Sequence, residues 1–193
     1  KMKIENKSFL VKSFHGEKNM LSDVSFVKNG MKKPVILLVH GFKGFKDWGH
    51  YHLLTNKFAE NNFVVVKFNL SHNGTTPNNP LDFVDLPAFS NNNYTIELDD
   101  IKSMLDYIVK SDLPVDSKEV DINNIILIGH SRGGGISIVK AAEDKRIKKL
   151  VTWASVVKLG FMADNQALVN WKKNGVLHIF NSRTKQDMPL KYQ

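Results

Sequence analysis

The residues best suited to chemistry in this sequence form the pentapeptide Gly129–Gly133, which reads Gly-His-Ser-Arg-Gly and follows the apolar run Ile125–Ile128. In this G-x-S-x-G pattern a serine lies on a tight turn between a strand and a helix, with its hydroxyl above the strand ends. Small residues two positions before and after the serine are needed because the turn is strained. The pattern predicts that Ser131 is a nucleophile for acyl transfer. The alternative is a structural turn in which Ser131 only caps the helix.

A second turn, His40–Gly44, follows the apolar run Val35–Val39. Enzymes of acyl transfer place one donor of the oxyanion hole in a glycine-containing turn after an early strand. The backbone amides of Phe42 and Arg132 are therefore predicted to converge on the oxygen of a tetrahedral intermediate. By itself the His-Gly pair would indicate no more than a turn that ends a strand.

Four further residues near these turns are candidates for lining a site: Gly41, Lys43, His72 and His130. His72 lies in a loop rich in proline and asparagine, where it either lines the mouth of the site or is a solvated loop residue. His130 is next to the serine, and we expect it to pack at the turn rather than to act as a base. Lys43 and Lys46 could attract an acidic substrate, but lysines near a turn are usually only solvated.

Other residues near the two turns have plainer interpretations. The aromatic side chains of Phe42, Phe45 and Trp48 either line an acyl pocket or belong to the core, and we expect the core. His50 and His52 begin a helical pattern without a supporting carboxylate, so we expect no metal there. The sequence as a whole implies neither a metal nor an organic cofactor.

Four short apolar runs must position these residues. They are continuous rather than alternating and rich in β-branched side chains, which is typical of parallel strands buried on both faces. The runs are Pro34–Val39, Phe63–Phe68, Asn124–Ile128 and Leu150–Ala154. Between them lie helical patterns of apolar residues at 3.6-residue spacing. These patterns cover His52–Glu60, Thr95–Lys110 and Gly134–Glu143.

Alternation of strands and helices predicts an α/β fold with a doubly wound, mostly parallel sheet. The first thirty residues predict a leading antiparallel hairpin over Ile4–Val11 and Met20–Val27. The stretch Ser71–Asn93 has three prolines and no periodicity, and such a long loop within a domain is usually functional or disordered. After Ala154 the pattern weakens, and Gly175–Arg183 is typical of an alternating strand that enters a turn.

Composition limits the class of protein. The 193 residues suit one domain with a sizeable core, and 27 basic against 19 acidic side chains give a net charge of +8. The basic residues are scattered, so we expect a solvated basic surface and no nucleic-acid partner. The sequence contains no cysteine, which excludes disulfides, thiolate nucleophiles and zinc–cysteine sites. No apolar run approaches the roughly 18–20 residues of a membrane span. The first residues also lack the apolar stretch of a secretory signal, and we expect a cytoplasmic protein without a membrane partner.

The order of these motifs resembles the α/β-hydrolase superfamily, and within it the dienelactone-hydrolase-like and acyl-peptidase-like serine esterases. The resemblance extends from about Lys32 to Gln193 and is most specific at Gly129–Gly133. It implies that Ser131 is the nucleophile and that the Phe42 and Arg132 amides form the oxyanion hole. The implied substrate is a small-molecule ester or acyl compound, cleaved at an ester or an amide bond through an acyl-enzyme. It further implies a hydrolase core over residues 1–159 and the start of a cap insertion over residues 160–193.

The sequence departs from the family pattern at its catalytic base. The pattern places an acid and a general-base histidine after the cap, and the sequence reaches Gln193 before either. We therefore expect that the native protein continues beyond Gln193 and that the 193-residue chain alone is inactive, because an isolated serine is a poor nucleophile. Asp164 and His178 follow Ser131 in the chain order of a triad, but His178 lies in the pattern of a cap hairpin. A further alternative is a non-catalytic binding module with a hydrolase fold.

Overall fold

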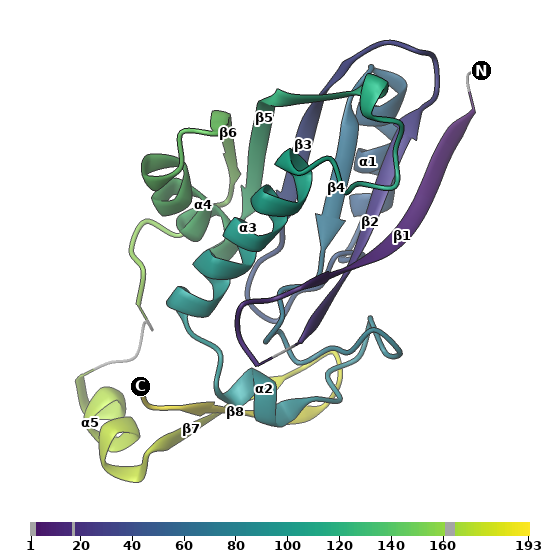
Figure 1. Ribbon diagram of the computed structural model, residues 1–193. Helices are drawn as coiled ribbons and strands as arrows, with labels where there is room; N and C mark the ends of the chain where they lie inside the picture. The colour runs from purple at the N-terminus through teal and green to yellow at the C-terminus, as the bar shows by residue number, and fades with distance from the viewer. Residues whose placement is uncertain (1–2, 17, 161–164) are drawn as a thin grey trace.

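A mixed sheet of six strands organises the computed structural model, which describes residues 3–16, 18–160 and 165–193 (Figure 1). Its spatial order is β1-β2-β4-β3-β5-β6. In chain order the strands are β1 (Ile4–Lys12), β2 (Asn19–Val27), β3 (Lys33–Val39), β4 (Val64–Phe68), β5 (Val120–His130) and β6 (Ile147–Trp153). The predicted α/β class, the parallel strands and the leading hairpin are confirmed.

The central strands are parallel and the leading hairpin is antiparallel. In β3, Leu37 pairs with Val66 of β4 on one side and with Leu127 of β5 on the other, both in parallel register. The hairpin of β1 and β2 joins the sheet through an antiparallel pairing of β2 with β4. Because β3 and β5 are neighbours and run in the same direction, their carboxyl ends meet at one edge of the sheet. The two predicted turns therefore lie side by side.

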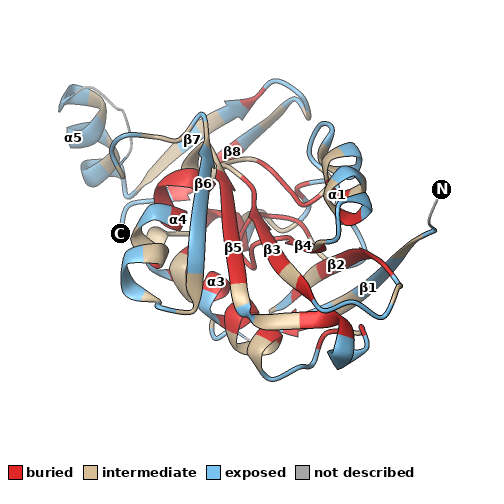
Figure 2. Ribbon diagram, turned by 90° about the horizontal axis from the view of Figure 1, so that it is seen from above, coloured by how far each residue is buried: buried red, intermediate tan, exposed pale blue. Residues whose placement is uncertain are grey.

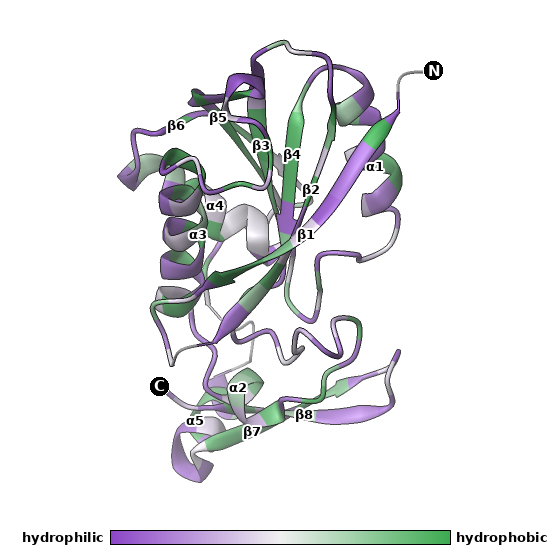
Figure 3. Ribbon diagram, turned by 45° about the vertical axis from the view of Figure 1, so that its right-hand side comes forward, coloured by the Kyte–Doolittle hydropathy of each residue, from purple (hydrophilic) through white to green (hydrophobic). Residues whose placement is uncertain are grey.

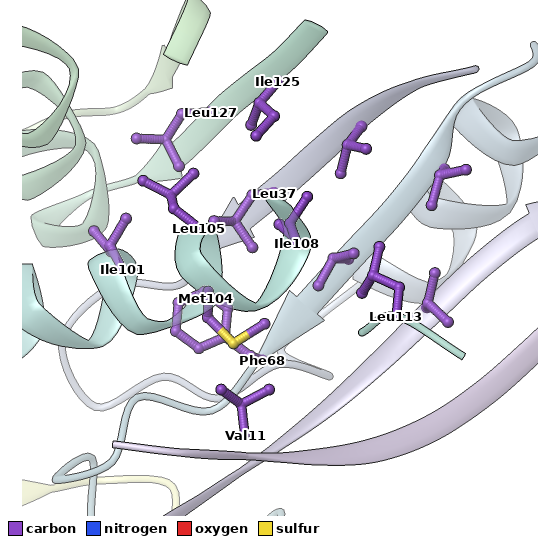
Figure 4. Packing of buried hydrophobic residues seen from close by; sticks show 14 of the residues in the cluster. Val11, Leu37, Phe68, Ile101, Met104, Leu105, Ile108, Leu113, Ile125 and Leu127 are labelled. Atoms are coloured by element: carbon purple, nitrogen blue, oxygen red, sulfur yellow. The ribbon is translucent and has the colours of Figure 1, made fainter. Parts of the chain in front are cut away.

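Helices cover both faces of the sheet. Helices α3 (Tyr94–Val109) and α4 (Arg132–Glu143) pack on one face, and α1 (Tyr51–Glu60) packs on the other (Figure 1). On α3 the fully buried side chains Ile101, Met104, Leu105 and Ile108 recur at helical spacing and face the strands, as Figure 4 shows. Asn93 caps this helix, because its side chain accepts a hydrogen bond from the Ile96 amide.

Burial is uneven across the sheet. Most of β4 is hydrophobic, whereas β1 contains a hydrophilic stretch, Glu5 to Ser8, after its first residue (Figure 3). Figure 2 shows that β3 and β5 are largely buried while β6 is exposed. The expectation that the run Leu150–Ala154 is buried on both faces is therefore wrong, because in the described chain β6 pairs only with β5 and Leu150 and Val151 are 38% and 40% exposed.

The C-terminal part of the chain forms a separate unit. It contains α5 (Asn165–Asn174) and an antiparallel hairpin of β7 (Val176–Asn181) and β8 (Gln186–Lys191), which is a sheet of its own. A short helix, α2 (Leu86–Ser90), packs against β8 (Figure 1). The division of the chain at residues 159 and 160 into core and cap stays a prediction.

The stretch Ser71–Asn93 is more ordered than its sequence predicts. Besides α2 it contains a bridge between Thr76 and Asn79, and its Phe83 and Phe89 side chains are 1% exposed. These rings form a buried cluster with members from the His40–Gly44 region and from β8. The cluster consists of Phe45, Phe83, Phe89, Met188 and Leu190.

The remaining regular element is a 3₁₀ turn, Ser117–Glu119, before β5. Glu119 of this turn forms a buried ion pair with Lys33 at the start of β3, with 2.5 Å between Nζ and Oε2. Among the helices of the described residues, none combines the length and apolar content that crossing a membrane requires.

Candidate active site

Ser131 has the strained backbone that the pentapeptide predicts. It lies between β5 and α4 with φ 55° and ψ −123°, a combination that residues other than glycine rarely adopt. Although Ser131 is the N-cap residue of α4, its side chain makes no capping hydrogen bond. The serine hydroxyl is therefore not used to hold the helix. We call the turn Gly129–Gly133 the elbow.

Glycine is required on both sides of the serine by close backbone contacts. A Cβ atom at Gly129 would lie 2.3 Å from the Gly133 carbonyl oxygen, and one at Gly133 would lie 2.4 Å from the His40 carbonyl oxygen. Neither contact can be relieved by turning a side chain, because both involve backbone atoms. The spacing of the two glycines in the sequence thus follows from close packing within the elbow, at Gly129, and against the end of β3, at Gly133.

Backbone hydrogen bonds hold the elbow to the last residue of β6 and to the segment that follows it. The Ser131 amide donates to the Trp153 carbonyl oxygen at 2.9 Å, and the Ser131 carbonyl accepts from the Gly134 and Val156 amides at 3.0 and 3.3 Å. Gly134 lies directly beneath this segment, since a Cβ atom there would be 2.8 Å from the Ser155 side chain. The strained conformation of Ser131 is therefore held by these hydrogen bonds and by the close packing of Gly134 against Ser155.

The His40–Gly44 turn lies against the serine. A Cβ atom at Gly41 would lie 3.0 Å from Ser131 Cβ and 3.5 Å from Ser131 Oγ. The Gly41 carbonyl accepts hydrogen bonds from His40 Nδ1 at 2.9 Å and from the Gly44 amide at 3.1 Å. In a trans peptide the carbonyl and the next N–H point in opposite directions. Anchoring the Gly41 carbonyl therefore orients the Phe42 amide.

His40 is a buried, neutral side chain that links two strand ends. Its Nε2 accepts a hydrogen bond from the Leu70 amide after β4, while its Nδ1 donates to the Gly41 carbonyl. This pattern requires the tautomer with its proton on Nδ1. Burial lowers the pKa of His40 to about 4, although the hydrogen bond to Gly41 acts to raise it. His40 thus positions the turn and is not placed as a base.

The two predicted amide donors remain available. In the part of the chain that the structure describes, no hydrogen bond uses the backbone amide of Phe42 or of Arg132. The two residues are also joined through their side chains, because the Arg132 guanidinium lies 5.3 Å from the centre of the Phe42 ring. Phe42 directly follows Gly41, which lies against the Ser131 side chain, and Arg132 directly follows Ser131 itself. The arrangement can present two N–H groups beside one hydroxyl.

The Arg132 side chain is held by the start of α3. Its Nε donates to Glu97 Oε2 at 2.9 Å, and its guanidinium lies 4.1 Å from the centre of the Tyr94 ring. Glu97 Oε1 accepts from Asn92 Nδ2 at 2.7 Å, and the Glu97 side chain is 3% exposed. Sequence reasoning missed this pair, because Glu97 carried only the general signal of a carboxylate in a first helical turn.

A buried cluster of charges supports the His40–Gly44 turn from behind. Lys46 forms ion pairs with Asp23 and Asp47, and Lys67 forms ion pairs with the same two carboxylates. Burial would raise the pKa of Asp47, but hydrogen bonds from Lys46 and Lys67 hold it below its ordinary value. The prediction that Lys46 is solvated is wrong, since the residue is 5% exposed and neutralised within this cluster.

The other candidate lining residues are dispersed. Lys43 is half-buried, and its Nζ donates to the Phe180 carbonyl on β7 at 3.4 Å. His130 stacks edge-on against Tyr51 of α1, with 6.4 Å between the ring centres. Of the three aromatic residues expected in the core, Phe45 is buried at 7% exposure and Phe42 packs at its edge, whereas Trp48 is 38% exposed.

His72 is not a solvated loop residue, since it is 8% exposed. Its Nδ1 lies 2.7 Å from Ser71 Oγ, and the Ser71 amide donates to Asp100 Oδ2 at 2.7 Å. Burial lowers the pKa of His72 to about 4, and the charges of Lys18 and His15 lower it further. Among the described residues, the His72 side chain forms its hydrogen bond with Ser71 and none with Ser131.

Within the described residues no histidine forms a hydrogen bond with the Ser131 hydroxyl. His178 lies on the exposed side of β7 opposite Pro189, and Asp164 lies outside the described residues. Nor does the described part contain three or more His, Asp or Glu side chains placed to hold a metal ion.

Comparisons with known proteins bear on the fold. The sequence matches no protein-family model and no curated protein. Its structure is similar to those of the α/β hydrolase GrgF from Penicillium sp. sh18 (12% identity, TM-score 0.68, covering 96% of this chain and 61% of that one) and the dienelactone hydrolase from Anabaena variabilis (14%, 0.59, 78% and 64%). It is also similar to esterase Est22 (18%, 0.60, 84% and 47%). The chain spans about half to two thirds of the length of the solved structures that it matches.

Proposed function

We propose that this chain, whose fold is that of the α/β hydrolases, carries the nucleophile and oxyanion-binding part of a serine hydrolase that cleaves carboxylic esters. One observation carries the proposal: Ser131 is held at φ 55° and ψ −123° between two glycines, with a hydroxyl that caps no helix. Strain of this kind costs about 1–3 kcal/mol and persists where the surroundings enforce it. A turn that only joined a strand to a helix would not need it.

The chemistry that the residues support is acyl transfer. Ser131 Oγ would attack the ester carbonyl carbon, forming a C–O bond while the hydroxyl proton passes to a base. The carbonyl oxygen would take up the electron pair and accept hydrogen bonds from the Phe42 and Arg132 amides. Each such donor is typically worth about 3–4 kcal/mol of the barrier. The bond to the alcohol then breaks and the alcohol leaves with a proton. Water hydrolyses the acyl-enzyme in a second step.

The base is the one part of this mechanism that no described residue supplies. The internal alternative of Asp164 and His178 gains no support from His178, which lies exposed on β7. The absence of a described histidine at the Ser131 hydroxyl favours, as a second candidate function, a binding module that keeps the fold without the reaction. The substrate that we propose for the catalytic candidate is a small-molecule ester.

A fluorophosphonate probe distinguishes the two candidates. In the native full-length protein we expect it to modify Ser131, with the adduct mapped to the peptide that contains the elbow, and Ser131→Ala to abolish the modification. Ser155→Ala is the matched control, because Ser155 is adjacent to the elbow and its hydroxyl donates to the Val156 carbonyl. This variant should react as the parent does. Modification at another residue, or none at any, would contradict a catalytic Ser131 and favour the binding module.

Ester turnover by the 193-residue chain gives a second measurement. Oxyanion donors without a complete triad leave a residual rate of roughly 10³-fold over water. We expect slow hydrolysis of p-nitrophenyl acetate that Ser131→Ala leaves nearly unchanged, because this residual rate comes from the amide donors and not from the serine. Fast turnover that His178→Ala abolishes would instead establish the internal triad.

A further inference from the structure

A cavity of about 160 Å³ lies beside the elbow, between the start of α3 and the C-terminal unit. We call it the Arg132 pocket, after the elbow residue that lines it together with Asn92, Tyr94, Trp171, Leu190 and Lys191. Its volume is roughly five times the share of one water molecule in the liquid. Larger hollows of about 370 and 280 Å³ lie against β1, and no elbow residue lines them.

Arg132 reaches the pocket with hydrogen-bond donors to spare. Its Nε is occupied by Glu97, but no described residue accepts a hydrogen bond from either Nη nitrogen. Its guanidinium is held flat by the rings of Tyr94 and Phe42, at 4.1 and 5.3 Å, and the side chain is 16% exposed. A fixed guanidinium with two such donors matches a planar carboxylate, which can accept two parallel hydrogen bonds.

The charge of the pocket lining is positive. Lys191 on β8 is exposed and forms no ion pair in the described chain, and none of the residues that line the pocket is acidic. Glu97 faces Arg132 from α3 and neutralises it, so Lys191 supplies the excess charge. A singly charged ligand fits this balance better than a dianion, which would be repelled more strongly by the buried Glu97 carboxylate.

Besides its polar residues, the pocket lining contains two aromatic side chains and one aliphatic side chain. Tyr94 comes from the start of α3, and Trp171 and Leu190 come from the C-terminal unit. The Trp171 indole is fixed, because its Nε1 donates to the Leu190 carbonyl at 2.8 Å, and its ring meets the Tyr192 ring edge-on. These three side chains favour a flat, apolar ligand body next to the charged end.

We infer that the Arg132 pocket binds a small aromatic carboxylate, with the carboxylate on the Arg132 Nη donors and Lys191 and the ring between Tyr94 and Trp171. Resting on the proposed function, this ligand is one end of the substrate. Arg132 directly follows Ser131 and lines the pocket, so a ligand held in the pocket can extend toward an ester carbonyl at the elbow. The substrate class is then an ester that carries an aromatic carboxylate at one end.

The binding part is tested with the chain alone and without any turnover. Benzoate is titrated into ¹⁵N-labelled protein, and the signals of the Arg132 Nε–H and the Trp171 indole N–H are followed by NMR. We expect both signals to shift with saturation, and neutral benzamide, of the same shape, to bind at least tenfold more weakly. Equal shifts with benzamide, or no shift with benzoate, would overturn the inference. Tighter binding of inorganic phosphate would overturn the carboxylate assignment.

A pair of lysine variants tests the role of charge. Lys191→Gln should weaken benzoate binding about fivefold, which is typical of one partly exposed charge. Lys185→Gln changes the net charge by the same amount at the turn between β7 and β8, outside the pocket, and should leave the affinity unchanged. Equal effects of both variants would mean that only the overall charge of the protein matters, and would contradict a site at Lys191.

The link to the elbow has its own readout. Benzoate should slow the modification of Ser131 by a fluorophosphonate in proportion to occupancy of the pocket. If benzoate binds but gives no protection, the pocket is separate from the substrate site and that part of the inference fails. If the fluorophosphonate never modifies Ser131, the proposed function is contradicted. The NMR titration still shows in that case whether benzoate binds in the Arg132 pocket.

Discussion

Glu97 and Arg132 join helix α3 to the residue that follows Ser131, with 2.9 Å between Oε2 and Nε. The two side chains are 3% and 16% exposed, so the pair is almost removed from water. Asn92 donates to the second carboxylate oxygen at 2.7 Å. The elbow is therefore braced by a buried ion pair as well as by the backbone contacts of its glycines.

Removing the acid of this pair should be costly. Glu97→Ala leaves the Arg132 charge buried without its partner, and we expect the free energy of unfolding to fall by about 3–5 kcal/mol. Lys102→Ala on the same helix removes an exposed pair with Asp106 and should cost about 1 kcal/mol or less. Urea denaturation of both variants measures the difference. Similar losses in the free energy of unfolding for the two variants would contradict the stabilising role that we assign to Glu97.

The strained serine makes a second prediction. Glycine adopts φ 55° freely, whereas alanine keeps the strain, so Ser131→Gly should be more stable than Ser131→Ala by about 1 kcal/mol. Thermal and urea unfolding of the two variants test this order. Neither variant can react with a fluorophosphonate. A glycine variant less stable than the alanine variant would mean that the backbone at this position is not strained in solution.

The contact of Gly133 with the end of β3 makes a third prediction. In Gly133→Ala the new methyl group meets two backbone carbonyl oxygens, those of His40 and Val39, at 2.4 and 2.6 Å. We expect a loss of about 3 kcal/mol or more, at the upper end of overpacking. Gly49→Ala is the matched control, because it has positive φ but nothing within 4 Å, and it should cost about 1 kcal/mol. Circular dichroism during urea unfolding measures both.

The free energy of unfolding depends on pH through buried titratable groups, and these groups act in opposite directions. Burial raises the pKa of Asp100 to about 6, against hydrogen bonds from Ser13 and Ser71. The folded protein then binds more protons here than the unfolded chain between about pH 4 and 6, so this group stabilises the fold on acidification. His40 and His72, with their pKa values lowered to about 4, act in the opposite sense over the same range.

Asp100→Asn should therefore make the protein more sensitive to acid. The asparagine oxygen can still accept from the Ser71 amide while its Nδ2 donates to Ser13 Oγ, so the variant should fold. We expect its free energy of unfolding to fall between pH 6 and 4 by about 2 kcal/mol more than that of the parent. Denaturation series at several pH values measure this. Parallel curves for the two proteins would rule out an elevated pKa at Asp100.

The core elements were predictable because their patterns are strong. The runs of valine, isoleucine and leucine in β3, β4 and β5 are too apolar for any place but a covered sheet, and the helical spacing of Ile101 to Ile108 places one face of α3 on it. Strand β8, with Pro189 and Lys191, has no comparable pattern, and α2 is one turn within a proline-rich stretch. Strand β8 and helix α2 are stabilised by their contacts with each other.

The elbow was predictable because a short motif describes it. The strain at Ser131, the clash at Gly133 and the turn at Gly41 all follow from backbone geometry that fixed spacing encodes. The Arg132–Glu97 pair and the Lys46 cluster were not predictable. The pair joins residues 35 positions apart, and the cluster joins side chains from three separate segments of the chain. A single charged residue in a sequence gives no sign of whether its partner buries it.

The docking of the C-terminal hairpin on the Ser71–Asn93 stretch has a consequence for synthesis. The Gln186 side chain donates to the Phe83 carbonyl across 103 positions of the chain, and Met188 covers the same cluster. A ribosome that adds about 5–20 residues per second needs roughly 5–20 s to make that interval. During this time Phe83 and Phe89 lack their later partners. Nascent chains of this protein should therefore present an aromatic patch that chaperones recognise until β8 has emerged.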